Sequence, residues 1–170
     1  MKKLLFYLFM LIPLAANAED DVNYKLFKDA VVVNLTEDFS NFRIIKMPAQ
    51  NYLEMKYNMD YQKFTKNFME VLLSTANISF NEYSLKISND QPSDFELKIM
   101  PVSADGDGEH TIMCRLVYKP TDTLISSFKL NTNRGDNGAF IEELMKRLSI
   151  SGKKLAKKLE SIKKVANSTK

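Results

Sequence analysis

A single histidine beside a short acidic turn is the part of this sequence that comes nearest to a catalytic arrangement. His110 is the only histidine, and it directly follows the stretch 105–109, Asp-Gly-Asp-Gly-Glu. A histidine-dependent hydrolase needs a partnered nucleophile, and no Gly-x-Ser-x-Gly motif is present. We therefore expect His110 to be a solvent-exposed loop residue at the edge of this turn.

The acidic turn itself supports two interpretations. Closely spaced carboxylates with glycines can bind calcium, but an EF-hand loop needs about twelve residues and this stretch is too short. Asp and Gly also suit a plain connection between two strands, which we favour. Zinc would need about four ligands, and His110 and Cys114 supply at most two of them. We expect no metal and no cofactor; a small hydrolase that uses Asp105, Asp107 and Glu109 is the alternative.

Three further sequence patterns indicate little about function. Cys114 is the only cysteine and lies in an alternating apolar run, so we expect a buried, inert thiol and no intrachain disulfide. Arg134-Gly135-Asp136 matches an integrin-binding tripeptide, but it leads into a predicted helix that Asp136 or Asn137 would cap. The Asn-x-Ser/Thr sequences at Asn34, Asn77 and Asn167 would mean little if the protein is bacterial.

Positive charge is concentrated at the C-terminal end of the chain. Residues 19–145 contain 13 Lys/Arg and 20 Asp/Glu, a net charge of −7, whereas residues 146–170 contain 9 Lys/Arg and one acid, a net charge of +8. The predicted terminal helix carries lysines on the faces away from Leu155, Leu159 and Ile162. These candidate binding residues are Lys153, Lys154, Lys157, Lys158, Lys163 and Lys164. Such a helix could dock on anionic lipid headgroups or on an acidic partner protein; the alternative is a helix packed on the sheet with solvated lysines. Nucleic acid is not an expected partner.

The first 18 residues are typical of a cleavable secretory signal. Lys2 and Lys3 precede an apolar stretch, and Ala16-Asn17-Ala18 has the small-x-small pattern of a signal peptidase site. The apolar stretch is shorter than the about 20 residues of a spanning helix, so an uncleaved anchor is the less favoured alternative. No cysteine stands at the cleavage point, which disfavours a lipoprotein. We predict a periplasmic or secreted bacterial protein without a transmembrane segment in the mature chain.

After the signal, the sequence predicts a short lead at 19–28, a single α+β domain at 29–166 and a frayed tail at 167–170. Alternating apolar residues predict strands, and Asp60 is expected to cap a helix that Asn77 closes. The expected strands are 29–35, 42–47, 78–87, 95–99, 112–119 and 124–130. The predicted fold is a two-layer α+β sandwich: a largely antiparallel sheet of about five to six strands with two helices on one face, in the order β-β-α-β-β-β-β-α. Gly152 leaves open whether the terminal helix breaks.

With these elements placed, the chain resembles small envelope domains over roughly residues 28–160. The group includes the periplasmic domain of the curli-export lipoprotein, the outer-membrane activators of penicillin-binding proteins and the N-terminal domain of the Tol-system translocation protein. The similar features are Val31-Val32-Val33, Phe68-x-x-x-Leu72, Ser93-Asp94-Phe95-Glu96-Leu97 and Tyr118-Lys119-Pro120-Thr121-Asp122. The chain departs from the group in the second strand, in the missing glycine of the hairpin turn and in the missing anchor cysteine.

The resemblance implies a non-enzymatic envelope accessory protein and carries no site residues across. Together with the signal and the basic helix, it favours an exported, non-catalytic binding or assembly protein of the bacterial envelope. Peripheral binding to a membrane surface through the basic helix, or the small hydrolase above, are the alternatives.

Overall fold

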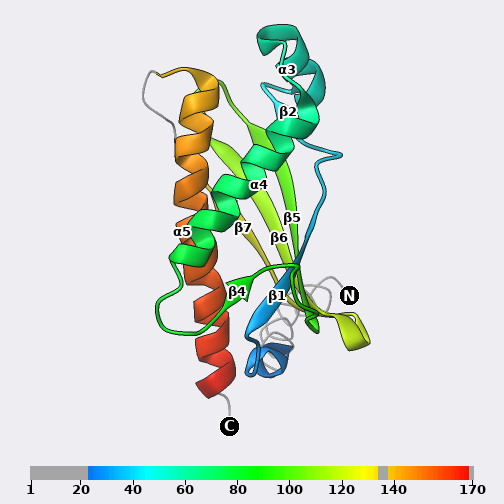
Figure 1. The fold of residues 1–170 in the computed structure, drawn as a ribbon, viewed down its shortest axis with the longest axis vertical. Coiled ribbons are helices and arrows are strands. Elements are labelled where there is room, and N and C mark those ends of the chain that lie inside the picture. The colour runs from blue at the N-terminus through cyan, green and yellow to red at the C-terminus, as the bar shows by residue number, and fades with distance from the viewer. Residues whose placement is uncertain (1–22, 134–137, 169–170) are drawn as a thin grey trace, which may run out of the picture.

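The computed structural model describes residues 23–133 and 138–168. Within these two ranges, a mixed and mostly antiparallel sheet of seven strands carries three α-helices, which confirms the predicted α+β fold (Figure 1). The predicted signal at 1–18 and the Arg134-Gly135-Asp136 tripeptide lie outside the described residues.

The longest strand, β5, lies in the middle of the sheet. The strands are β1 (Val32–Glu37), β2 (Arg43–Ile44), β3 (Met47–Pro48), β4 (Lys86–Ile87), β5 (Phe95–Ala104), β6 (His110–Tyr118) and β7 (Thr123–Asn131). On one side of β5, β6 and then β7 follow as an antiparallel meander. On its other side, β1 pairs in parallel with the first part of β5 and β2 with its end. Strand β4 pairs with β1, so β4 and β7 are opposite ends of the sheet.

Two long helices lie side by side on one face of this sheet (Figure 1). The helices are η1 (Lys25–Phe27), α3 (Ala49–Tyr57), α4 (Tyr61–Ile78), η2 (Lys119–Thr121) and α5 (Phe140–Ser168). Asp60 caps α4 as predicted, because its carboxylate accepts the backbone N–H of Lys63 at 2.6 Å. Helix α3 was not predicted. Pro48, expected only to end a strand, also opens this helix, where a missing N–H is harmless.

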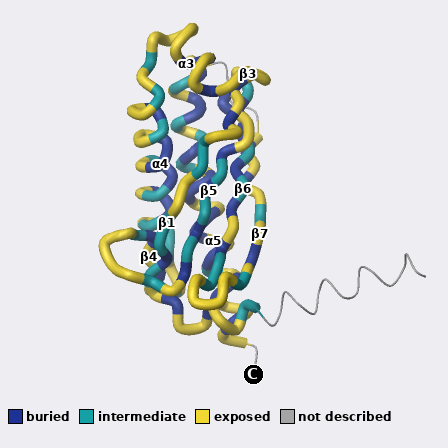
Figure 2. Tube along the Cα trace, turned by 90° about the vertical axis from the view of Figure 1, so that its right-hand side faces the viewer, coloured by how far each residue is buried: buried dark blue, intermediate teal, exposed yellow. Residues whose placement is uncertain are grey.

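The core lies between the sheet and helices α4 and α5. Strands β5 and β6 alternate buried residues toward the helices with partly exposed residues on the other face. The buried apolar residues include Phe27, Phe64, Phe68, Leu72, Leu97, Ile99, Ile112, Leu116, Ile125, Leu144, Leu148, Leu155 and Leu159. No described helix covers the outer face of the sheet, and the residues of β5 and β6 on that face are intermediate or exposed (Figure 2).

Two predicted strands are much shorter than expected. The segment 42–47 contains only β2 and the start of β3, because Ile45 and Lys46 form a tight turn with φ of 47° and 66°. The segment 78–87 contributes only β4, since α4 continues to Ile78. Asn77 does not end the helix. Its side-chain amide instead forms hydrogen bonds with the carbonyl and the N–H of Ile87, at 3.0 and 2.8 Å, which a neighbouring strand would otherwise pair with.

Helix α5 runs without a break through Gly152, which resolves the question that this glycine raised. A Cβ atom at Gly152 would stand 2.5 Å from the carbonyl oxygen of Leu72 and 2.8 Å from the Cβ of Thr75, both in α4. The glycine is therefore required by the close approach of the two helices and not by a kink.

Candidate functional site

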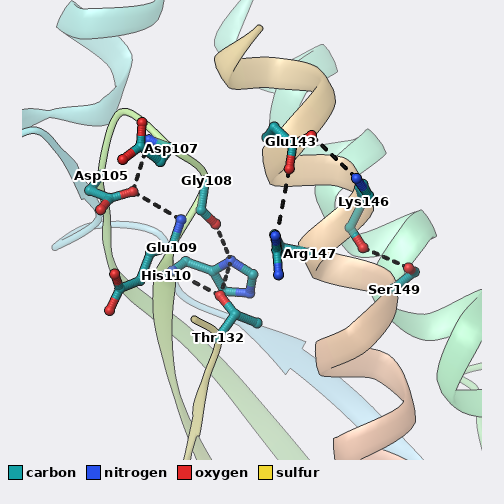
Figure 3. A network of polar contacts seen from close by, with 10 residues as sticks. All are labelled: Asp105, Asp107, Gly108, Glu109, His110, Thr132, Glu143, Lys146, Arg147 and Ser149. Atoms are coloured by element: carbon teal, nitrogen blue, oxygen red, sulfur yellow. Dashed lines mark hydrogen bonds and ion pairs between the residues drawn. The ribbon is translucent and has the colours of Figure 1, made fainter. Parts of the chain in front are cut away.

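His110 is buried, so the prediction of an exposed loop residue is wrong. It begins β6 and is only 2% exposed. Its Nδ1 lies 3.0 Å from the Gly108 carbonyl oxygen, and its Nε2 lies 2.8 Å from the Ser151 hydroxyl of α5. A carbonyl oxygen only accepts, so Nδ1 carries the proton and Nε2 accepts from Ser151. Thr132 completes the set by accepting the backbone N–H of His110 at 3.1 Å (Figure 3).

We call Gly108, His110, Thr132 and Ser151 the polar joint. A serine that donates to a histidine has the geometry of a nucleophile and its base. Here, however, Ser151 is completely buried, so no substrate can reach its oxygen. Burial lowers the pKa of His110, which keeps the imidazole neutral and its two hydrogen bonds intact. The joint connects the end of the β5–β6 hairpin to α5 through the His110–Ser151 hydrogen bond, and we interpret it as a stabilising contact of the fold.

The acidic turn is organised around one carboxylate. Asp105 accepts the backbone N–H groups of Asp107 and Glu109 at 3.0 and 2.9 Å, as a connection between strands requires (Figure 3). Among the described residues, no three His, Cys, Asp or Glu side chains come together as metal ligands. Of the three acids of the hydrolase hypothesis, Asp105 thus uses its carboxylate within the turn, and Asp107 and Glu109 contribute backbone N–H groups to it. The nearby His110 faces away into the core.

A buried carboxylate with two cationic neighbours lies near the start of α5. Glu143 is 5% exposed, with Oε1 3.4 Å from Lys146 Nζ and Oε2 3.8 Å from Arg147 Nε (Figure 3). A carboxylate in the first turns of a helix is stabilised by the helix dipole, and the two cations follow it on the same face. Cys114 is also buried, as predicted, and burial raises the pKa of its thiol to about 12, which disfavours the reactive thiolate.

One of the six candidate lysines is not available for binding. Lys163 is 8% exposed, donates to the backbone carbonyl of Ala30 and lies 5.6 Å from the ring centroid of Tyr83. Burial lowers its pKa. Placing Lys163 on a solvent-facing side was therefore wrong. Helical spacing could have shown this, because Lys163 follows Leu159 by four residues and shares its buried face.

The other five lysines are exposed and form two stripes along α5. Lys153, Lys157 and Lys164 form the outer stripe, and Lys154 and Lys158 form the stripe nearer the sheet. Lys154 donates to the backbone carbonyl of Asn131 at 2.6 Å. The Lys158 ammonium lies 5.8 Å from the ring centroid of Phe128. Both of these lysines therefore lean toward β7.

Between α5 and β7 lies a groove of about 420 Å³. We call it the lysine groove; its lining residues are Phe128, Lys129, Leu130, Asn131, Lys154 and Lys158. None of them is acidic. Lys129 was missed from the sequence: alternation places it on the outer face of its strand, but nothing local shows that β7 is the edge of the sheet next to α5.

The apolar stripe of α5 is not available to a membrane. Leu155 and Leu159 are completely buried and Ile162 is 2% exposed, because all three pack into the core. No helix in the two described ranges combines the length and apolar character that a membrane span requires. Contact between this helix and a lipid surface would involve its exposed side chains, mainly lysines, and not this stripe.

A larger hollow of about 610 Å³ lies where α3 leads into α4. Its lining residues are Gln50, Glu54, Asn58, Met59, Asp60, Tyr61 and Gln62. Asp60 is already engaged as the cap of α4, and none of the lining residues is cationic. The lysine groove is the better candidate for a functional surface.

No protein-family model matches this chain, and no curated protein is similar to it in sequence. Several solved structures are similar to it in fold. A PelC dodecamer from Paraburkholderia phytofirmans aligns with a TM-score of 0.40 and 8% identity, over 74% of this chain and 85% of that one. A neuraminyllactose-binding hemagglutinin homolog from Helicobacter pylori aligns with a TM-score of 0.42 and 15% identity, over 81% and 92%. A Xanthomonas campestris protein aligns with a TM-score of 0.37 and 11% identity, over 83% and 89%.

Proposed function

We propose that this chain is an exported, non-catalytic binding or assembly protein of the bacterial cell envelope that holds an acidic partner protein in its lysine groove. The observation that carries the proposal is the groove itself. Lys129 of β7 and Lys154 and Lys158 of α5 converge on it, and no acidic side chain lines it. Export rests on the signal pattern of residues 1–18.

A protein partner fits this surface better than a membrane. Peripheral helices gain most of their affinity by inserting an apolar face, and α5 has buried that face in its own core. What remains is electrostatic attraction of about 1 kcal/mol per lysine at an anionic surface. A protein can add hydrogen bonds and apolar contacts to the same charges.

Carbodiimide cross-linking in periplasmic extracts tests the proposal, because this reagent joins a lysine amine directly to a carboxylate. The full chain carries a C-terminal tag, and sequencing of the exported protein should give Glu19 as its first residue. We expect one acidic protein to be cross-linked through Lys129, Lys154 or Lys158. The double variant Lys154→Gln/Lys158→Gln should give much less product, because only Lys129 remains in the groove, and the matched variant Lys63→Gln/Lys66→Gln on α4 should give as much as the wild type.

Equal cross-linking by the two double variants would overturn the proposal. So would binding to phosphatidylglycerol vesicles that is strong, salt-sensitive and reduced by the groove variant, if no protein is cross-linked, since that result would assign the groove to lipid.

A further inference from the structure

We infer that the lysine groove is a strand-addition site, in which an extended segment of the partner with consecutive acidic residues pairs with the open edge of β7. This inference rests on the proposed function and specifies its partner. Strand addition combines main-chain hydrogen bonds to a sheet edge, which give affinity, with side-chain contacts that give selectivity. The lysine groove has both elements: an edge strand and cations on either side of it.

The edge of β7 is open where the lysines gather. In the described chain, β7 pairs only with β6. The Thr132 N–H donates to the His110 carbonyl at 3.1 Å, so residue 132 faces β6. Hydrogen-bonding residues alternate along an antiparallel pair, and the register is regular from Asn131 back to Ser126. The backbone groups of Ser127, Lys129 and Asn131 therefore point away from β6.

Two contacts mark the ends of this open stretch. The carbonyl of Asn131 is directed outward, as alternation requires, since Lys154 of α5 donates to it at 2.6 Å. At the other end, the side chain of Asn23 donates to the carbonyl of Leu124 at 3.0 Å and covers the start of β7. The segment between these ends, around Ser127 and Lys129, is the part that an added strand would use.

The cations flank this edge on both faces of the sheet. Lys129 lies on the uncovered face, opposite Met113 of β6. Lys154 and Lys158 come from α5, which covers the other face. Successive side chains of an added strand point to opposite faces. Two neighbouring acids would thus meet Lys129 on one face and Lys154 or Lys158 on the other, which specifies consecutive acids and not a single one.

Charge also distinguishes this partner from a second copy of the chain. A symmetric pairing of β7 with β7 would bring Lys129 and its neighbours opposite the same lysines, and like charges across a strand pair are destabilising. The phosphatidylglycerol headgroup offers acceptors for the lysines but no N–H groups for the outward carbonyls of β7. An acidic extended protein segment satisfies the lysines and the edge together.

Peptide binding tests the main-chain requirement without changing the protein. The probe is the labelled peptide Val-Thr-Glu-Glu-Thr-Val with blocked ends, and its twin carries a methyl group on every amide nitrogen. Both have the same charge, but the twin cannot donate main-chain hydrogen bonds. We expect fluorescence anisotropy with the full mature chain to show at least about tenfold weaker binding of the twin. Equal affinity would overturn strand addition.

Protein variants test the same point from the other side. Ser127→Pro removes an outward N–H without changing charge, and proline is tolerated where a strand edge faces solvent. We expect the variant to bind the peptide about tenfold more weakly at an unchanged melting temperature, with Ser127→Ala as the control. Lys154→Gln and Lys158→Gln should each weaken binding about two- to fivefold. If Ser127→Pro does not fold, the comparison with the methylated peptide still tests whether binding requires main-chain hydrogen bonds.

The two proposals fail in different ways. Strand addition would be overturned if binding depends on the lysines but its affinity is unchanged by N-methylation of the peptide and by Ser127→Pro. The proposal of an acidic partner would then still stand. Cross-linking that does not depend on the lysines would overturn the proposed function itself. A dimer in sedimentation that Ser127→Pro dissociates would also overturn the inference, because the edge would then belong to a second copy.

Discussion

The polar joint and the lysine groove are neighbours on α5, yet they use polar side chains in opposite ways. Ser151 of the joint and Lys154 of the groove are less than one helical turn apart. The joint is buried and uncharged, and His110 has a partner for each ring nitrogen. The groove is exposed and cationic. Burying a charge costs several kcal/mol unless it is well paired, so the interior favours neutral hydrogen bonds, and charges available for a ligand remain at the surface.

This contrast divides the effects of substitution. Changes in the joint and in the helix contact beside it should alter folding stability and leave ligand binding unaffected. Changes in the groove should weaken ligand binding and leave folding stability nearly unaltered. Lys163 is the critical case, because it is chemically like the groove and is placed like the joint.

The largest effect is expected at Gly152, next to the joint. Gly152→Ala brings a Cβ within 2.5 Å of a backbone oxygen of α4, which cannot move aside as a flexible side chain would. We expect a loss of about 3 kcal/mol in the free energy of unfolding, although alanine is favoured over glycine in a helix by about 1 kcal/mol. Urea denaturation measures the loss. Ser161→Ala, on the exposed side of α5, is the matched control, and a more stable Gly152→Ala protein would contradict the close helix contact.

A smaller loss is expected when the joint is cut. Ser151→Ala leaves Nε2 of His110 without its donor in the core, which should lower the free energy of unfolding by about 2 kcal/mol. His110→Gln should have a similar effect. The double variant should lose less free energy of unfolding than the two single variants added together, because the two side chains share one hydrogen bond. Additive losses would show that Ser151 and His110 do not interact.

The joint also predicts a pH dependence. Burial lowers the pKa of His110 below its ordinary value of 6.5, so below pH 6.5 the unfolded chain binds a proton that the folded chain does not. The free energy of unfolding should therefore decrease as the pH falls below 6.5, by up to about 1.4 kcal/mol per pH unit. His110→Gln should reduce this slope by the contribution of one group.

The sequence predicted these regions unequally, and the reason is physical. Local patterns carried most of the fold, including the Asp60 cap, the strands around Leu97 and Leu116 and the terminal amphipathic helix. Contacts between distant segments were not visible in them. His110 and Ser151 are 41 residues apart and meet only because the β5–β6 hairpin ends beneath α5. A hydrophilic residue after an acidic turn has no local feature that marks it as buried.

The candidate site was half predictable for the same reason. Lysines at helical spacing indicated the exposed side of α5, and five of the six lie there. That β7 is an edge strand follows from sheet order, which alternation along one strand does not specify. The contribution of Lys129 therefore required the fold.

Lys163 should behave like the joint in spite of its charge. Lys163→Gln removes the ammonium that donates to the Ala30 carbonyl, and we expect a loss of about 1 kcal/mol in the free energy of unfolding with unchanged binding of the acidic peptide. Lys164→Gln, its exposed neighbour, is the matched control and should leave both quantities unchanged. Weaker peptide binding by Lys163→Gln at unchanged stability would contradict the expectation that buried polar residues affect stability and only groove residues affect binding.

The smallest change in stability is expected in the groove itself. Lys154 and Lys158 are exposed, and their contacts with Asn131 and Phe128 lie at the surface. Lys154→Gln and Lys158→Gln should each alter the free energy of unfolding by no more than about 0.5 kcal/mol. The same variants should weaken peptide binding, and added salt should narrow the difference from wild type, because exposed charges are screened. A stability loss as large as that of Ser151→Ala would show instead that these lysines hold α5 against β7 through their contacts with Asn131 and Phe128.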